Sequence, residues 1–206
     1  MKNLFLLSIL FLLLACKKNG CTDVLASNYD HKANRNDGSC IGPCMGCKYQ
    51  GGIVFYLDGN GGGLIAALVD QSNSAPWGCD GVNISGANAT SIGSGNLNTT
   101  NIEIDCEANG TAADICTNLS LEGYNDWFLP SRDELDLMYQ NIKKGNSLDN
   151  KGAFSNRDYW TSSQGDQSIA WKQGFYGGYQ SYGSKSILAA VRAVSYTHLR
   201  AHETLD

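Results

Sequence analysis

Residues 123–142, GYNDWFLPSRDELDLMYQNI, place an aromatic run and a proline directly before the start of an amphipathic helix. Ser131 and Glu134 have the spacing of a capping box, in which each side chain accepts the other residue's backbone N–H. The apolar residues after them recur at the spacing of one helical face: Leu135, Met138, Tyr139 and Ile142. The acidic residues at the helix start also suit the helix dipole. We therefore expect scaffold here, with Ser131 and Glu134 as structural residues rather than catalytic ones.

The elements around this stretch predict an α+β domain. A glycine-rich turn at 58–63 separates two apolar, β-branched runs, which is typical of a β-hairpin. Thr111 and Asp114 indicate the cap of an earlier, shorter helix, which Gly123 would end. Short runs near the end of the chain predict further strands over residues 158–164, 169–176, 179–183 and 187–194. Two helices among antiparallel strands are an α+β pattern.

Residues 70–110 form a long polar stretch rich in Asn, Gly, Ser and Thr. A loop of this length inside a domain is usually functional or pinned. Cys79 and Cys106 are the expected pins, and a Cys106–Cys116 disulfide is the alternative.

The cysteine count points to an oxidising compartment. Eight cysteines in an exported chain indicate disulfides rather than a cytosolic zinc site. A linker over residues 41–48 holds Cys44 and Cys47, for which we expect a local disulfide because no thioredoxin-like βαβ pattern follows. If Cys16 carries lipid, an odd number remains, so at least one cysteine is free or pairs between chains.

Length and charge limit the function. The chain has 206 residues, enough for one ordinary domain with small attachments. Its formal net charge is -5 and its sequence pI is about 5.1. The sequence therefore has no basic footprint for nucleic acid.

The first residues, MKNLFLLSILFLLLAC, combine one lysine, a short apolar run and a cysteine directly after a small residue. The run is too short for a permanent transmembrane helix. This pattern predicts a bacterial lipoprotein signal peptide over residues 1–15, lipidation of Cys16 and a tether over residues 16–20. We expect a lipid-anchored protein at the outer membrane or cell surface, with the membrane as one partner. An uncleaved anchor, the alternative, also leaves the chain on a membrane.

Residues 21–40 are polar and bounded by Cys21 and Cys40, which predicts a disulfide that clamps this segment. The pattern resembles a short repeat of bacterial surface proteins that is compared with calcium-binding thrombospondin type 3 repeats. Calcium takes about six to eight oxygen ligands. The oxygen donors of the segment are Asp23, Asn28, Asp30, Asn36 and Asp37. A disulfide-stapled spacer built from turns is the alternative to a calcium site.

The end of the chain has an unusual origin. VSYTHLRAHET, residues 194–204, is the translation of a DNA stretch that resembles a transposon-based sequencing adaptor. We therefore expect residues 194–206 to be non-native. A native stop codon directly after Asp206 in genomic DNA would contradict this.

Several segments occur in an order that resembles one family. They are YQGGIVFYLDGNGGGLIAALVDQS, WGC, IGSGNLNT, GYNDWFLPSRDELDLMY, YWTSS, AWKQGF and VRAV. Over residues 49–193 the chain is identified as a member of the Lcl C-terminal domain family, named for the end of a collagen-like bacterial adhesin. The resemblance implies a C-type-lectin-like fold, with Trp127, Leu129 and Pro130 packed at its centre. The suspected tail replaces the end of the family pattern, so we expect a truncated last strand.

The resemblance also implies a surface module that binds glycan or extracellular matrix. Aromatic rings stack on sugar rings and ammonium groups pair with sulfate, which selects one late tract. Its candidate ligand-binding residues are Trp171, Lys172, Tyr176, Tyr179, Tyr182 and Lys185. The alternative is that every second one faces the core of a sheet. The calcium and sugar motifs of true C-type lectins are absent from the sequence.

Two other functions are alternatives. An envelope structural or assembly module would bind another protein. An oxidase like the formylglycine-generating enzymes, which share the fold, would need a reactive cysteine pair near the late strands, and the cysteines lie earlier in the chain. His31, in the Cys-bounded segment, is the only histidine before the suspected tail. We therefore expect no enzyme, no catalytic residue and no cofactor other than calcium in residues 21–40.

Overall fold

The computed structural model describes most of the chain, namely residues 17–22, 26, 28–40, 42–144 and 150–197. Contacts divide it into two compact units, Met1–Ile41 and Gly42–Asp206. The predicted signal peptide and Cys16 lie outside the described residues. Within the described part, no helix has both the length and the apolar character needed to cross a membrane.

A disulfide and a short pair of strands hold the first unit. β1 (Asn19–Gly20) runs parallel to β2 (Arg35–Asn36), and Cys21 is bonded to Cys40 as predicted. Among the described residues of this unit, only Cys21 and Ala26 are buried apolar residues. Because so little apolar surface is buried, we infer that closure of the disulfide loop is the main stabilising constraint.

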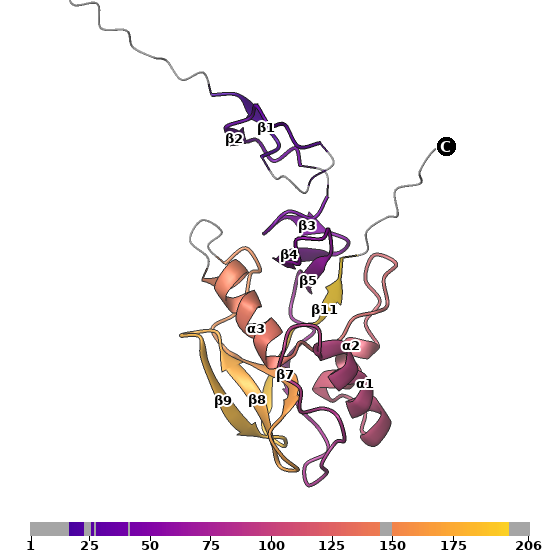
Figure 1. The fold of residues 1–206 in the computed structure, drawn as a ribbon. Helices are drawn as coiled ribbons and strands as arrows, with labels where there is room; N and C mark the ends of the chain where they lie inside the picture. Colours follow the sequence, from indigo (N-terminus) through magenta and orange to yellow (C-terminus); the bar gives the residue numbers. More distant parts are fainter. Residues whose placement is uncertain (1–16, 23–25, 27, 41, 145–149, 198–206) are drawn as a thin grey trace, which may run out of the picture. The chain divides into compact units, whose positions relative to one another are not determined.

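A five-stranded sheet forms one part of the second unit (Figure 1). In spatial order its strands are β6 (Ser72–Pro76), β10 (Leu188–Val191), β7 (Asp158–Gln164), β8 (Ile169–Gly174) and β9 (Tyr179–Ser184). Neighbouring strands are antiparallel except β10 and β7, which are parallel. β7, β8 and β9 confirm the strands predicted from the late aromatic runs.

A four-stranded antiparallel sheet joins the early and late parts of the second unit. In spatial order its strands are β11 (Val194–Tyr196), β5 (Gly63–Ala67), β4 (Gly52–Leu57) and β3 (Lys48–Tyr49). β4 and β5 are the predicted hairpin. A side chain on Gly63 would collide with the Tyr56 carbonyl oxygen, which explains the glycine at the end of this turn.

β11 extends the domain beyond the boundary at residue 193 that the sequence predicted. Val194 is fully buried, and Ser195 Oγ donates to Asp126 Oδ2 at 2.9 Å. The Tyr196 ring centroid lies 5.2 Å from that of Phe128. The first three residues of the suspected tail thus occupy a strand position, while the non-native origin of residues 194–206 stays a prediction.

The described residues contain three α-helices, which are α1 (Gly95–Asp105), α2 (Ala112–Thr117) and α3 (Arg132–Met138), and α3 continues as the π-helix η1 (Tyr139–Lys143). α2 and α3 confirm the two predicted helices. Thr111 Oγ1 accepts the backbone N–H of Asp114 at 3.2 Å. Both halves of the capping box between Ser131 and Glu134 are present.

α1 corrects the prediction of an unbroken loop over residues 70–110, which also contains β6. The helix buries one apolar side chain, Ile102, beside the polar Asn98 and Thr99 and the N-terminal Gly95. Its sequence therefore lacks the repeating apolar stripe that indicates a helix. Tertiary contacts stabilise it instead, including a hydrogen bond from Leu129 N to Thr99 Oγ1 at 3.1 Å.

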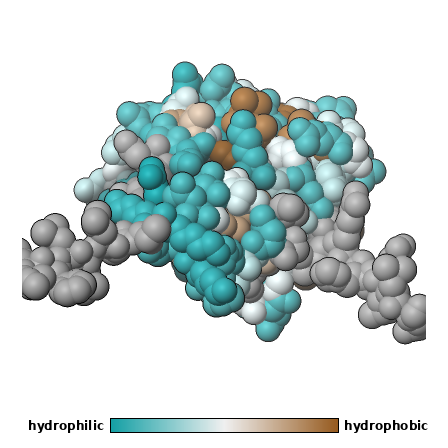
Figure 2. Space-filling view, turned by 90° about the horizontal axis from the view of Figure 1, so that it is seen from above, coloured by the Kyte–Doolittle hydropathy of each residue, from teal (hydrophilic) through white to brown (hydrophobic). Residues whose placement is uncertain are grey.

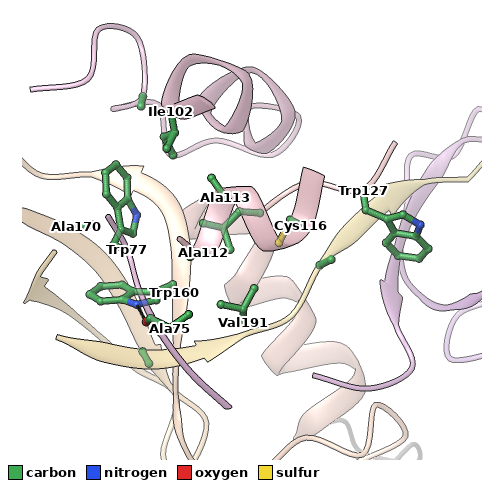
Figure 3. Packing of buried hydrophobic residues seen from close by; sticks show 14 of the residues in the cluster. Ala75, Trp77, Ile102, Ala112, Ala113, Cys116, Trp127, Trp160, Ala170 and Val191 are labelled. Atoms are coloured by element: carbon green, nitrogen blue, oxygen red, sulfur yellow. Dashed lines mark hydrogen bonds between the residues drawn. The ribbon is translucent and has the colours of Figure 1, made fainter. Parts of the chain in front are cut away.

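Three buried indoles organise the main core, in which Trp77, Trp127 and Trp160 lie with α1 and α2 (Figure 3). Trp160 Nε1 donates to the carbonyl of Ala75 at 2.9 Å, and Trp77 Nε1 donates to the carbonyl of Thr161 at 2.8 Å. These two bonds join segments 85 and 84 positions apart in the chain. The tryptophans therefore combine apolar burial with long-range hydrogen bonds.

The aromatic stretch before α3 is scaffold, as expected. Trp127, Leu129 and Pro130 are all buried. The backbone N–H of Ser162 donates to the Pro130 carbonyl at 2.8 Å. This segment therefore connects α3 to β7, in agreement with the central position that the family resemblance implied.

The structure resolves the cysteine pairing that the sequence left open. Cys79 is bonded to Cys106, and Cys44 is bonded to Cys47. Cys116 is free and buried on α2 (Figure 3). Burial raises the pKa of the Cys116 thiol above its usual value, so this thiol is unreactive at neutral pH.

The VRAV segment contributes a buried ion pair. The Arg192 side chain is 1% exposed, and its Nη2 lies 2.6 Å from Asp70 Oδ1. Nη1 donates to the carbonyls of Ala67 and Gly152 at 2.8 and 2.9 Å. Tyr159 Oη donates to Asp70 Oδ2 at 2.9 Å, and burial raises the pKa of Tyr159 to about 12. Each charge of the pair therefore has several partners, as a buried ion pair needs.

Candidate functional site

The predicted ligand-binding tract lies on the hairpin formed by β8 and β9. Trp171 and Tyr182 are directly opposite each other across the two strands, with ring centroids 4.0 Å apart. The guanidinium carbon of Arg132, the first residue of α3, lies 5.1 Å from the centroid of the Trp171 ring. A cation thus accompanies a contacting pair of aromatic rings.

Two further tyrosines lie at the turn end of the same hairpin. Tyr176 is 65% exposed and Tyr179 is 73% exposed. Aromatic side chains of this size are usually buried, so two neighbouring exposed rings indicate a contact surface. The register of β9 pairs Tyr179 with Gly174, so Tyr179 lies on the face of the hairpin opposite Trp171 and Tyr182. We name Arg132, Trp171 and Tyr182 the hairpin surface.

Arg132 was not predicted from the sequence. It follows the capping Ser131, so the sequence indicates only that it is the first residue of a helix. The packing of α3 against the hairpin brings it to Trp171, and Gln180 Nε2 donates to the Arg132 carbonyl at 3.0 Å. No local pattern in the sequence contains this contact, because Arg132 and Gln180 are 48 positions apart.

Lys172 belongs to the opposite face of β8, because successive side chains of a strand alternate. Its Nζ forms an ion pair with Asp158 Oδ2 at 2.5 Å, and its side chain is 14% exposed. The predicted pairing of this ammonium with a ligand sulfate would therefore have to replace an existing carboxylate partner.

Lys185 does not belong to this surface, which corrects its place among the predicted ligand-binding residues. The residue is fully buried, and its Nζ donates to the Val82 carbonyl at 2.7 Å and to Gln164 Oε1 at 3.1 Å. The ammonium also lies 4.5 Å from the centroid of a Trp77 ring. Burial lowers the pKa of Lys185. In the sequence Lys185 directly follows a predicted short strand, which suggested an exposed position. In the structure its ammonium instead bonds to the long loop through Val82.

The predicted calcium donors make local contacts in the first unit. Asp30 Oδ2 pairs with Lys18 Nζ at 2.6 Å. Asn36 Oδ1 accepts the backbone N–H of Gly38, and Asp37 Oδ1 accepts that of Ser39, at 2.9 and 3.0 Å. These are turn-forming contacts.

The other two predicted donors complete this comparison. Asn28 Nδ2 donates to the Ser39 carbonyl at 2.5 Å, and Asp23 lies outside the described residues. Among the residues that the structure describes, no group of three or more His, Cys, Asp or Glu side chains is arranged to hold a metal ion. The described donors therefore fit the stapled-spacer alternative, and calcium binding by residues 21–40 stays a prediction.

Glu134 is a buried carboxylate in the second unit. Its Oε2 accepts the backbone N–H of Ser131 at 2.7 Å, and its Oε1 accepts those of Gly93 at 2.7 Å and Gly95 at 3.4 Å. Glycines 93 and 95 flank the start of α1, so one carboxylate caps the beginnings of α1 and α3. Burial raises the pKa of Glu134. These contacts support the structural role that the capping box predicted.

Comparison with known proteins agrees with the motif order. No curated protein matches the chain. The model of the Lcl C-terminal domain family matches residues 68–195, which run from the end of the first hairpin to β11. This range contains the indole core, the buried Asp70–Arg192 pair and the hairpin surface. The chain belongs to the Lcl C-terminal domain family.

Proposed function

We propose that this protein is a non-catalytic, lipid-anchored surface protein whose second unit binds glycan or extracellular matrix. The observation that carries the proposal is the hairpin surface, where the exposed Tyr182 adjoins Trp171 and Arg132. Flat aromatic faces provide large contact area at low entropic cost. The second unit is an adhesin-like binding module in this proposal.

We further propose a C-type-lectin-like fold for the second unit. Its support is the order of the elements: an early hairpin, two capped helices, then late antiparallel strands that return to the first sheet. In this arrangement, the long segment between β5 and α2 and the β8–β9 hairpin carry the ligand contacts.

Arg132 favours acidic over neutral ligands at the hairpin surface. Its guanidinium is charged at every physiological pH. Asp133 Oδ1 lies 2.9 Å from Arg132 Nη2, and both side chains are partly exposed. An exposed pair of this kind is worth only about 0–1 kcal/mol, so a ligand sulfate or carboxylate can replace Asp133.

The test is binding of the purified protein to immobilised heparin and to neutral glycans. Trp171→Ala or Tyr182→Ala should weaken binding by about tenfold, because truncation of a central aromatic contact usually costs more than about 1 kcal/mol. Tyr29→Ala, which removes an exposed tyrosine from the first unit, is the matched control. Binding that is equal in all three variants would remove the hairpin surface from the proposal.

An envelope assembly module is the second candidate, and α1 favours it. Leu97 is 63% exposed and Ile104 is 70% exposed, and residues seven positions apart lie on one helical face. The face in Figure 2 is mostly hydrophilic, with a small group of hydrophobic residues. Two results together would favour this function. The protein would bind none of the glycans, and it would form crosslinks to an envelope protein that Leu97→Asp abolishes.

The lipid anchor has a separate test. We expect metabolic labelling with a fatty acid to mark the protein, and Cys16→Ser to abolish both the label and membrane association. Cys116→Ser is the matched control, because Cys116 is a buried free thiol. Release of the wild-type protein into the medium without label would refute lipidation of Cys16.

A further inference from the structure

A polar hollow of about 590 Å³ lies between the long loop and the turn that joins β7 to β8. This volume is within the range of roughly 300–1,000 Å³ that is typical of small-ligand sites. Its polar lining consists of Asn83, Ser85, Asn88, Gln164, Asp166 and Gln167. None of these residues was singled out in the sequence.

Hydrogen bonds hold the two walls of the hollow together. The backbone N–H of Gln164 donates to the Ala87 carbonyl at 2.8 Å, and that of Gly81 donates to the Gln167 carbonyl at 2.9 Å. Gln164 Nε2 also donates to Asn83 Oδ1 at 3.0 Å. The loop is therefore fixed against the sheet, so a ligand would meet a preorganised surface.

The floor of the hollow is already saturated with hydrogen bonds. Gln164 Oε1 accepts from Ile84 N at 3.1 Å and from the buried Lys185 Nζ at 3.1 Å. Gln164 Nε2 donates to Ile84 O and Asn83 Oδ1. Gln164 therefore has a structural role in the hollow. Ligand contacts would come from the side chains on the rim.

The rim has hydrogen-bond donors and acceptors without partners among the described residues. Asn88, Gln167 and Ser85 are exposed, and within the described part of the chain their side chains form no hydrogen bond. Asp166 Oδ1 holds the turn by accepting from Ser168 N and Ile169 N at 2.7 and 3.0 Å. Its second carboxylate oxygen is free for a ligand hydroxyl.

An aromatic ring adjoins this polar rim. A side chain on Gly165 would collide with the Tyr182 ring, so Tyr182 lies directly over the turn that lines the hollow. Tyr182 also contacts Trp171, as described above.

The hollow thus combines amide groups, one carboxylate and an adjacent aromatic ring. These groups together suit a molecule with many hydroxyls and an apolar C–H face.

We propose that this hollow binds a neutral, polyhydroxylated ligand, namely a hexopyranose unit of a glycan. Primary amides and carboxylates bond vicinal hydroxyls as paired donors and acceptors. Among the lining residues Asp166 carries the charge, while the ammonium of Lys185 is buried and bonded to Gln164. The rim therefore disfavours sulfated or carboxylated sugars. This site differs in ligand charge and in its polar residues from the binding proposed at the hairpin surface, and Tyr182 adjoins both sites.

The test uses the purified protein and a panel of neutral hexasaccharides of glucose, galactose, mannose and N-acetylglucosamine, with a heparin hexasaccharide beside them. We expect at least one neutral hexasaccharide to bind saturably. The double variant Asn88→Ala/Gln167→Ala should weaken it by about tenfold or more, since two hydrogen-bonding side chains are lost. Neither side chain supports the fold, so the melting temperature should not change.

Two controls separate this proposal from the hairpin surface. Gln140→Ala removes an exposed amide from η1 and should leave neutral binding unchanged. Arg132→Gln should weaken heparin binding at the hairpin surface and leave neutral binding unchanged. The side-chain amide NMR signals of Asn88 and Gln167 should shift on titration with the bound neutral sugar. Absence of neutral binding, or neutral binding that the double variant leaves intact, would overturn the proposal.

Discussion

Glu134 illustrates what a single residue can and cannot reveal in sequence. Its spacing from Ser131 predicted a capping box, which the structure confirms. Its bonds to Gly93 and Gly95 cross 41 and 39 positions, so no local pattern contained them. The residue consequently holds two helices together, and its burial follows from that tertiary role rather than from its helix position.

The raised pKa of Glu134 makes a pH-dependent prediction. The folded state binds this proton more tightly than an unfolded chain, whose carboxyl has an ordinary pKa of 4.5. The contribution of Glu134 to stability therefore falls as the pH rises from 4.5 through the folded pKa. Glu134→Gln cannot ionise and lacks this dependence. We expect the free energy of unfolding lost in Glu134→Gln to be larger at about pH 5 than at about pH 8.

Chemical denaturation of both proteins across this pH range measures the difference. Glu107→Gln, a change at an exposed acidic residue, controls for the general effect of lost charge. A loss that grows with pH would mean that the backbone donors outweigh burial and lower the pKa.

Arg192 carries the second prediction at this scale. Arg192→Met leaves Asp70, whose side chain is 10% exposed, without its cation. Loss of one partner of a buried ion pair costs about 3–5 kcal/mol in the free energy of unfolding. Arg157→Met, at an exposed arginine, should cost less than about 0.5 kcal/mol. Urea denaturation measures both, and similar values for the two variants would contradict a stabilising role of the pair.

The secondary-structure elements differ in how far the sequence predicts them. The β4–β5 hairpin, α2 and α3 have local signals, namely a glycine turn and two capping residues, and the structure contains all three. α1 was missed because Asn and Thr dominate it and its buried side chains are partly polar. Its helical conformation depends on contacts with Glu134 and Leu129, which a reading of residues 70–110 alone cannot supply.

The Cys79–Cys106 disulfide is the covalent constraint on the segment that contains α1. It spans 27 positions, whereas Cys44–Cys47 spans 3. In the loop-entropy model the longer closure contributes about 3.5 kcal/mol and the shorter one about 2 kcal/mol. We expect the double variant Cys79→Ala/Cys106→Ala to lose more thermal stability than Cys44→Ala/Cys47→Ala. The opposite order would show that strain or packing, rather than loop closure, controls these bonds.

On the scale of the whole molecule, the two units should unfold independently. The first depends on Cys21–Cys40, while the second has an extensive apolar core. Cys21→Ser/Cys40→Ser should remove amide hydrogen-exchange protection from residues 28–40 and leave the melting temperature of the second unit within about 2 °C. A large drop in that temperature would mean that the units stabilise each other.

The sites also form at this scale, which limits what the sequence can predict. Trp171 and Tyr182 of the hairpin surface were found because they are close in sequence, whereas the alternation of side chains places Tyr179 on the other face. Arg132 and the hollow were missed, since the walls of the hollow come from segments about 80 positions apart, as the Ile84–Gln164 hydrogen bond records. Lys185 was misplaced for the same reason: its neighbours in space, Val82 and Trp77, are distant in the chain.

The pairing of β5 with β11 has a consequence for how the chain folds. These strands come from nearly opposite ends of the second unit, so the smaller sheet closes only after almost the whole unit has been synthesised. Contacts between distant segments slow folding, because the entropy of closing a long loop is lost before the contact forms. Until then the outer edge of β5 presents unpaired backbone groups, and such an edge invites association with other chains. The nascent protein is therefore most prone to aggregate at this edge, late in synthesis.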